Sequence, residues 1–95
     1  MGKIRRLVLD TLKPYEPSII EMAAQLSELN GVSAVNISIS EMDRKVENAK
    51  ITIEGEEILY PQVSEVIEKL GGVIHSIDEV VAGKRIIDDA VTPQD

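Results

Sequence analysis

Two segments with helical patterning in this chain end in the same four-residue pattern, Leu-x-Gly-Val, at residues 29–32 and again at residues 70–73. Glycine just after the last apolar residue is typical of a helix end, because glycine adopts the left-handed conformation without steric cost. Each helical segment lies between segments with strand patterning. The chain therefore consists of two similar strand–helix–strand halves, which leaves few folds open to it.

The first half predicts a strand followed by a capped helix. Ile4–Leu12 is rich in aliphatic residues, and the two prolines of Lys13–Pro17 end it. Ser18 and Glu21 have the spacing of a capping box at the start of the helix. The apolar face of this helix has helical spacing and consists of Ile19, Met22, Ala23, Leu26 and Leu29.

A hairpin and a second helix–strand unit follow. Residues 35–39 and 50–54 alternate between apolar and polar types, which predicts two half-buried strands joined through the charged residues 41–47. Pro61 suits the first turn of a helix, and Val73–Ala82 is predicted as the last strand. The apolar face of the second helix comprises Val63, Val66, Ile67 and Leu70.

The order β-α-β-β-α-β predicts an α+β domain of the ferredoxin-like class. In this fold a four-stranded antiparallel sheet, in the order 4-1-3-2, carries both helices on one face. We expect a single domain over residues 1–95, with its core over about 4–83 and a polar tail over 84–95. The core must be aliphatic, because the chain has no Phe and no Trp.

Composition excludes several functions. Ten Lys and Arg against 17 Asp and Glu leave a net charge of −7, so nucleic acid and membrane surfaces are poor partners. The chain has no cysteine, which excludes disulfides, Cys-ligated zinc and thiol nucleophiles. Its patterning predicts neither a membrane span nor a signal peptide, and we expect a cytoplasmic location by default.

The sheet face turned away from the helices is predicted to be polar. If Leu9, Ile37 and Ile51 face the helices, alternation places these residues on the other face: Arg6, Val8, Asp10, Asn36, Ser38, Ser40, Lys50, Thr52, Glu54, Ser76, Asp78 and Val80. No aromatic residue lies among them, so this face lacks the base-stacking surface of RNA-recognition modules. The segment Lys13–Pro17 has no glycine, which predicts a rigid connector or a segment that closes over a small ligand, and not a phosphate cradle.

Acidic residues are the candidate metal ligands. Asp10 and Asp78 are predicted on one sheet face, and Glu41 and Asp43 project from the hairpin. Carboxylate oxygens select Ca²⁺ or Mg²⁺ over zinc or copper, so these four residues predict weak binding of a divalent cation. Water or a second subunit would complete the ligand shell. The structural alternatives are cross-strand pairing with nearby basic side chains and a solvated acidic turn.

His75, the only histidine, lies next to Ser76 and near Asp78, which raises the possibility of a catalytic triad. Neighbouring residues of a strand point to opposite faces, so His75 and Ser76 are not expected to act together. His75 is in phase with Ile77, which predicts an interior or interface histidine. Metal ligation and a pH-sensitive contact are the alternatives.

Several stretches together resemble one family. They are Asp10–Pro14, Gly31–Val32 with Val35–Ile37, Glu41-x-Asp43, Ile51–Gly55 and, most distinctive, Gly72–Gly83. From about Arg5 to Lys84 the chain is similar to the archaeal family named domain of unknown function 211. The resemblance implies a ferredoxin-like fold, an archaeal cytoplasmic setting and assembly into homo-oligomers, and it brings no assigned activity.

These features predict a non-enzymatic, homo-oligomeric module that binds a small ligand or a divalent cation in a regulatory or structural role. The second and fourth strands are the exposed edges of the predicted sheet, and Val80–Val81 and Ile86–Ile87 place apolar surface at the fourth. One alternative is a small enzyme that uses acidic residues as general base or metal ligands. Another is a purely structural partner-binding protein.

Overall fold

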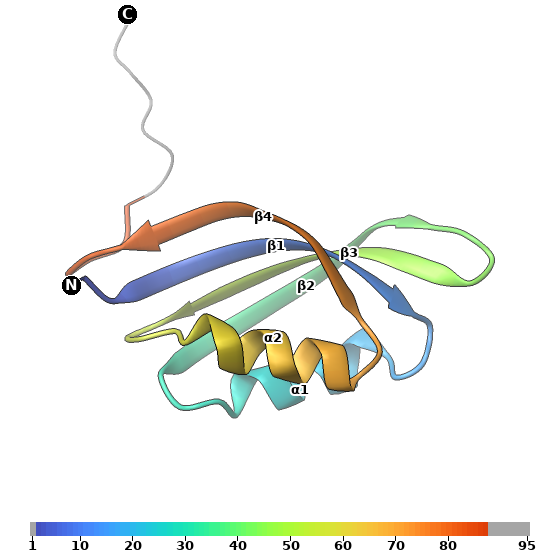
Figure 1. The fold of residues 1–95 in the computed structure, drawn as a ribbon, viewed down its shortest axis with the longest axis horizontal. Helices are drawn as coiled ribbons and strands as arrows, with labels where there is room; N and C mark the ends of the chain where they lie inside the picture. Colours follow the sequence, from blue (N-terminus) through green and yellow to red (C-terminus); the bar gives the residue numbers. More distant parts are fainter. Residues whose placement is uncertain (1, 88–95) are drawn as a thin grey trace, which may run out of the picture.

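The computed structural model describes residues 2–87 and contains four strands and two helices. The elements are β1 (Ile4–Pro14), α1 (Ile19–Ser27), β2 (Val32–Met42), β3 (Val46–Gly55), α2 (Tyr60–Lys69) and β4 (Val73–Ala82). The antiparallel sheet has the order β2-β3-β1-β4, and both helices lie on one side of it (Figure 1). The predicted ferredoxin-like βαββαβ arrangement and its strand order are confirmed. The expected tail over 84–95 lies partly outside the described residues.

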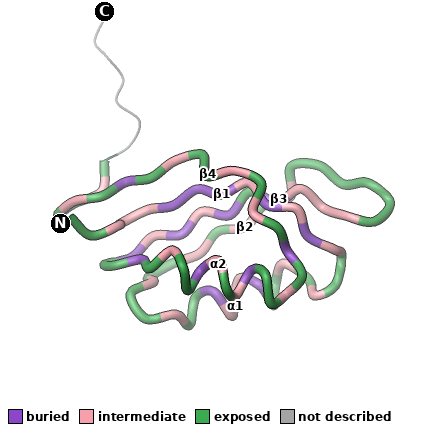
Figure 2. The backbone as a smooth tube through the Cα atoms, viewed as in Figure 1, coloured by how far each residue is buried: buried purple, intermediate pink, exposed green. Residues whose placement is uncertain are grey.

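The core fills the space between the helices and the two central strands, where the buried positions concentrate (Figure 2). Leu9, Ile51 and Ile53 have no exposed surface, as the alternation predicts. Ile37 and Ile39 lie on the same side of the sheet as these three residues, but they are only half-buried. The reason is their place on β2, an edge strand with a neighbour on one side only.

The helix boundaries follow from local chemistry. Ser18 is the N-cap of α1, and its hydroxyl oxygen accepts a hydrogen bond from the Glu21 N–H at 3.4 Å. The Glu21 carboxylate accepts from the Gln25 side chain at 3.2 Å. Gly31, after α1, has a φ of 87°, and a Cβ there would lie 2.0 Å from the carbonyl oxygen of Glu57. Only glycine fits this position.

The hairpin between β2 and β3 is longer than predicted. Ladder pairing continues to Met42 opposite Glu47, so most of the charged stretch 41–47 is strand and the turn is confined to residues 43–45. The Asp43 carboxylate holds this turn, because its Oδ1 accepts from the backbone N–H groups of Lys45 at 2.9 Å and Val46 at 3.0 Å.

Two β-bulges in β4 change which side chains face the helices. The pairing of β4 with β1 skips His75 and Asp78, so Ile77 lies opposite Leu9 and Val80 lies opposite Leu7. The prediction that Val80 lies on the face away from the helices is therefore wrong, because each bulge resets the period-two alternation. We call the side of the sheet opposite the helices the open face.

Candidate functional site

A chain of polar side chains crosses the open face at Asp10. The side-chain amide of Asn48 donates to Asp10 Oδ1 at 2.7 Å and to Ser40 Oγ at 3.1 Å. His75 Nδ1 lies 3.4 Å from Asp10 Oδ2. These four residues come from β2, β3, β1 and β4, so this polar network connects all four strands.

The position of His75 differs from the prediction of an interior residue. Its side chain is 68% exposed and lies beside Asp10, on the open face. His75 is itself a bulge residue, so the in-phase relation to Ile77 that predicted burial does not hold. Ser76 donates to Asp78 Oδ1 at 2.7 Å, so its hydroxyl is not bonded to the imidazole. The geometry therefore gives no support to a catalytic triad.

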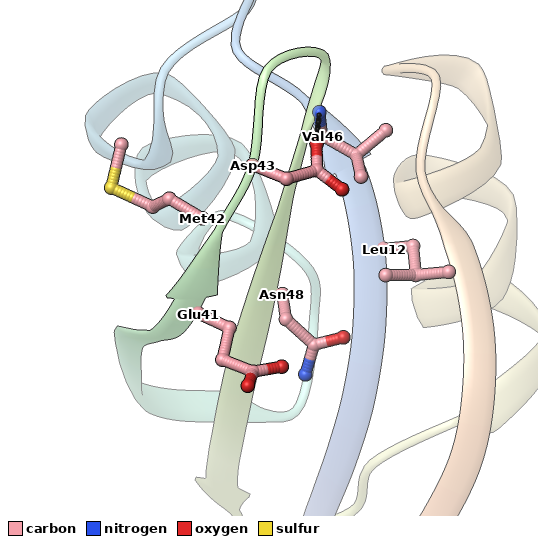
Figure 3. A pocket seen from close by; sticks show the side chains of 6 residues that line it. All are labelled: Leu12, Glu41, Met42, Asp43, Val46 and Asn48. Atoms are coloured by element: carbon pink, nitrogen blue, oxygen red, sulfur yellow. Dashed lines mark hydrogen bonds between the residues drawn. The ribbon is translucent and has the colours of Figure 1, made fainter.

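Two of the four predicted metal ligands, Glu41 and Asp43, line the same hollow at the hairpin (Figure 3). This hollow has a volume of about 260 Å³ and is lined by Leu12, Glu41, Met42, Asp43, Val46 and Asn48. Glu41 and Asn48 are cross-strand partners, Asp43 lies nearer the hairpin tip, and the Met42 side chain points away (Figure 3). We call this the hairpin hollow.

The other two predicted ligands lie outside the hairpin hollow. Asp10 is bonded to Asn48 and paired with His75, and Asp78 accepts from Ser76. Within residues 2–87, no three or more His, Asp or Glu side chains are grouped closely enough to hold a metal ion. The four candidates therefore do not form one site in a single copy of the chain.

The carboxylate of Asp43 is electrostatically distinct. The backbone N–H groups of Val46 and, secondarily, Lys45 hold the pKa of Asp43 below its ordinary value of 3.8. Hydrogen bonds to a carboxylate favour its charged form. Asp43 therefore presents a negative charge to the hairpin hollow at neutral pH.

Cross-strand ion pairs account for part of the charge on the open face. The guanidinium of Arg6 lies 2.8 Å from Glu54 on β3 and 3.6 Å from Glu79 on β4. This arrangement matches the structural alternative, the pairing of acidic residues with Arg6. Glu54 on β3 and Glu79 on β4 thus share one cationic partner on β1.

A buried ion pair at the far end of β1 was not predicted. The Lys13 side chain is fully buried, and its Nζ lies 3.0 Å from Glu47 Oε1 and donates to the Pro14 carbonyl at 2.6 Å. The signal was present in the sequence, because Lys13 is in phase with Leu7 and Leu9 on the helix side. The Tyr15 hydroxyl donates to the Asp43 carbonyl, so the connector after β1 is attached to the hairpin as well.

The fold and the open face define a small ferredoxin-like α+β domain with a polar, uncovered sheet. The chain belongs to the family of domain of unknown function 211, described as uncharacterised ArCR, whose model matches residues 5–95. It is 55% identical over 95 residues to the uncharacterised protein MJ0319 of Methanocaldococcus jannaschii, covering 100% of this chain and 98% of that protein. These matches confirm the resemblance. Neither helix within residues 2–87 is long and apolar enough to span a membrane.

Proposed function

We propose that this chain is a non-enzymatic, self-associating module in which β2 pairs with β2 of a second copy. The observation that carries this proposal is the character of the β2 edge. From Ala34 to Ile39 the strand pairs regularly with β3, and this stretch contains no charged residue and no proline. Natural edge strands usually carry charges, prolines or bulges that prevent pairing. On β2, irregular pairing occurs only outside this stretch, around Ser33 and Ser40.

The sequence of β2 is also complementary to itself. In an antiparallel pair centred on Ile37, Val35 lies opposite Ile39 of the partner subunit, and Asn36 lies opposite Ser38 of the partner subunit. Apolar residues then meet on the helix side and small polar residues meet on the open face. Val35, Ile37 and Ile39 are half-buried in the single chain, so a second copy would complete their burial.

The β4 edge, which the sequence favoured, is less suited to strand pairing. Its two bulges interrupt the row of backbone groups, and Val81 is 7% exposed and thus unavailable to a partner. Val73, Ile77 and Val80 are 62%, 48% and 51% exposed, respectively. These side chains provide apolar surface through which β4 could contact a second copy without strand pairing. Association through β4 is the alternative that the experiment below distinguishes.

A charge-swap experiment tests the β2 interface. Lysines at positions 36 and 38 (Asn36→Lys with Ser38→Lys) place like charges opposite each other in the proposed pair, and the matching glutamate variant does the same. Light scattering should report a monomer of 10.4 kDa for each variant alone and a dimer for their equimolar mixture. A matched control, Ile77→Lys with Val80→Lys on β4, should leave the dimer intact. If the control abolishes association and the β2 variants do not, the interface is on β4.

A second candidate function is weak divalent-cation binding in the hairpin hollow. Glu41 and Asp43 supply carboxylates to this hollow, and Asn48 uses its amide nitrogen in the polar network, which leaves its amide oxygen free within the described structure. Oxygen ligands of this kind suit Ca²⁺ or Mg²⁺. Three protein ligands do not fill the shell of such an ion, so water or a second subunit would supply the rest.

A further inference from the structure

A second hollow lies at the opposite end of the sheet, where β1 begins and β4 ends. It has a volume of about 590 Å³ and is lined by Gly2, Lys3, Arg5, Glu56, Gly83 and Lys84. The antiparallel pairing of Ile4 with Ala82 places the residues before β1 beside those after β4 (Figure 1). We call this the cationic hollow. Its size is within the range of small-molecule sites.

The guanidinium of Arg5 fixes the shape of the cationic hollow. Its Nε donates to the carbonyl of Gly55 at 2.9 Å, and its Nη1 donates to the carbonyls of Gly83 at 3.3 Å and Lys84 at 2.6 Å. Arg5 thus ties the end of β3 to the segment after β4. Its second terminal nitrogen, Nη2, makes no hydrogen bond to the described residues and is available to a ligand.

The charge of this hollow opposes that of the whole chain. Three lining residues are basic and one, Glu56, is acidic, in a protein whose net charge is −7. Lys3 and Lys84 have no ion-pair partner among residues 2–87. Cations gathered in a concave site focus the local field on an anion.

Glycine leaves room beside these cations. Gly83 has a φ of 131°, which side-chain-bearing residues rarely adopt, and a Cβ built there would meet nothing within 4 Å. A side chain at Gly2 would lie 3.4 Å from the Gly83 backbone nitrogen. The wall of the hollow between Lys3 and Lys84 is therefore bare backbone.

We propose that the cationic hollow binds a small anion that carries two or more phosphate charges. The anchored Arg5 guanidinium, whose Nη2 is not bonded to the described residues, and the ammonium groups of Lys3 and Lys84 suit phosphate oxygens. Three cations and one carboxylate give the lining a net charge of +2, so its attraction grows with the charge of the anion, and a multiply charged ligand gains most. The acidic remainder of the surface restricts the contact to this hollow, which excludes an extended nucleic-acid backbone.

Calorimetric titration with pyrophosphate at constant ionic strength tests this site in the full-length chain. Lys3→Gln with Lys84→Gln should weaken binding on the order of tenfold or more, because two charge-assisted contacts are lost. The control, Lys45→Gln with Lys69→Gln, removes the same charge elsewhere and should change the affinity less than about twofold. Glu56→Gln should tighten binding.

Three outcomes would overturn the proposal. The first is that the wild-type chain does not bind pyrophosphate at millimolar concentration. The second is that both double variants lose affinity equally. The third is that citrate binds more tightly than pyrophosphate. The amide resonances of Lys3, Gly83 and Lys84 give a second readout. These resonances should shift on addition of pyrophosphate. If the resonances of residues that line the hairpin hollow shift instead, the anion binds at that hollow and not at the cationic hollow.

Discussion

Lys13 and Glu47 form an ion pair whose lysine side chain is completely buried, with 3.0 Å between Nζ and Oε1. The two residues are cross-strand partners at the ends of β1 and β3. The Glu47 side chain keeps 15% of its surface exposed, so water reaches only one member of the pair. The pair therefore joins the end of β1 to the β2–β3 hairpin at the edge of the aliphatic core.

Removing one member of this pair should be costly. Lys13→Met leaves the Glu47 carboxylate without its partner. Urea denaturation should show a decrease in the free energy of unfolding toward the lower end of a range of about 3–5 kcal/mol. The double variant Lys13→Met with Glu47→Leu should recover most of that loss, because no charge is then left buried. Equal losses in the single and double variants would contradict the role of the pair.

Core and edge positions of the sheet should respond differently to truncation. Ile51 has no exposed surface, so Ile51→Ala should cost about 2–5 kcal/mol. Ile37 is half-buried, so Ile37→Ala should cost about 1–2 kcal/mol in dilute solution and more at concentrations where copies associate. Chemical denaturation at two protein concentrations measures the free energy of unfolding of each variant. An Ile37→Ala loss that is independent of concentration would argue against burial of Ile37 by a second copy.

The turn at Asp43 should depend on pH. Because the folded-state pKa of Asp43 is lowered by the N–H groups of Val46 and Lys45, its stabilising contribution is present above the ordinary value of 3.8. That contribution is lost as the pH falls through the lower folded pKa. Hydrogen exchange of the Val46 amide should accelerate, relative to the intrinsic rate, over that acidic range. Asp43→Asn should remove this pH dependence, and an unchanged profile would show that other groups cause it.

A cation in the hairpin hollow should raise the melting temperature. Binding to the folded state alone stabilises the chain by mass action, so melting in millimolar Ca²⁺ should occur above melting in chelator. Asp43→Asn and Glu41→Gln should each abolish the shift, whereas Asp78→Asn, outside the hollow, should retain it. If only Asp78→Asn loses the rise in melting temperature, the cation binds at β4 and not in the hairpin hollow. No shift in the wild-type chain would reject cation binding.

The positions of the strands and helices could be predicted from the sequence because they depend on local patterns. Helical spacing, the Ser18 cap and the Leu-x-Gly-Val endings each identify an element within one or two turns. The burial of Leu9 and Ile51 followed from alternation along β1 and β3, whose pairing with each other is regular. These signals require no knowledge of distant parts of the chain.

The candidate sites were less predictable, because they depend on register and on contacts across the sheet. The bulges at His75 and Asp78 are defined by the pairing of β4 with β1, and no residue type in β4 predicts them. Because of these bulges, His75 lies beside Asp10 on the open face and Val80 lies on the helix side. The cationic hollow joins residues near the two ends of the chain, so it became visible only once β1 and β4 were paired.

The β2–β2 interface can be observed directly by nuclear magnetic resonance on a mixture of isotope-labelled and unlabelled chains. Filtered spectra of this mixture detect only contacts between copies. We predict cross-peaks from the Ile37 methyl groups to Ile37 of the partner subunit, together with cross-peaks between Val35 and Ile39 of the partner subunit. Intermolecular cross-peaks confined to Ile77 and Val80, or none at concentrations where light scattering reports a dimer, would contradict the account.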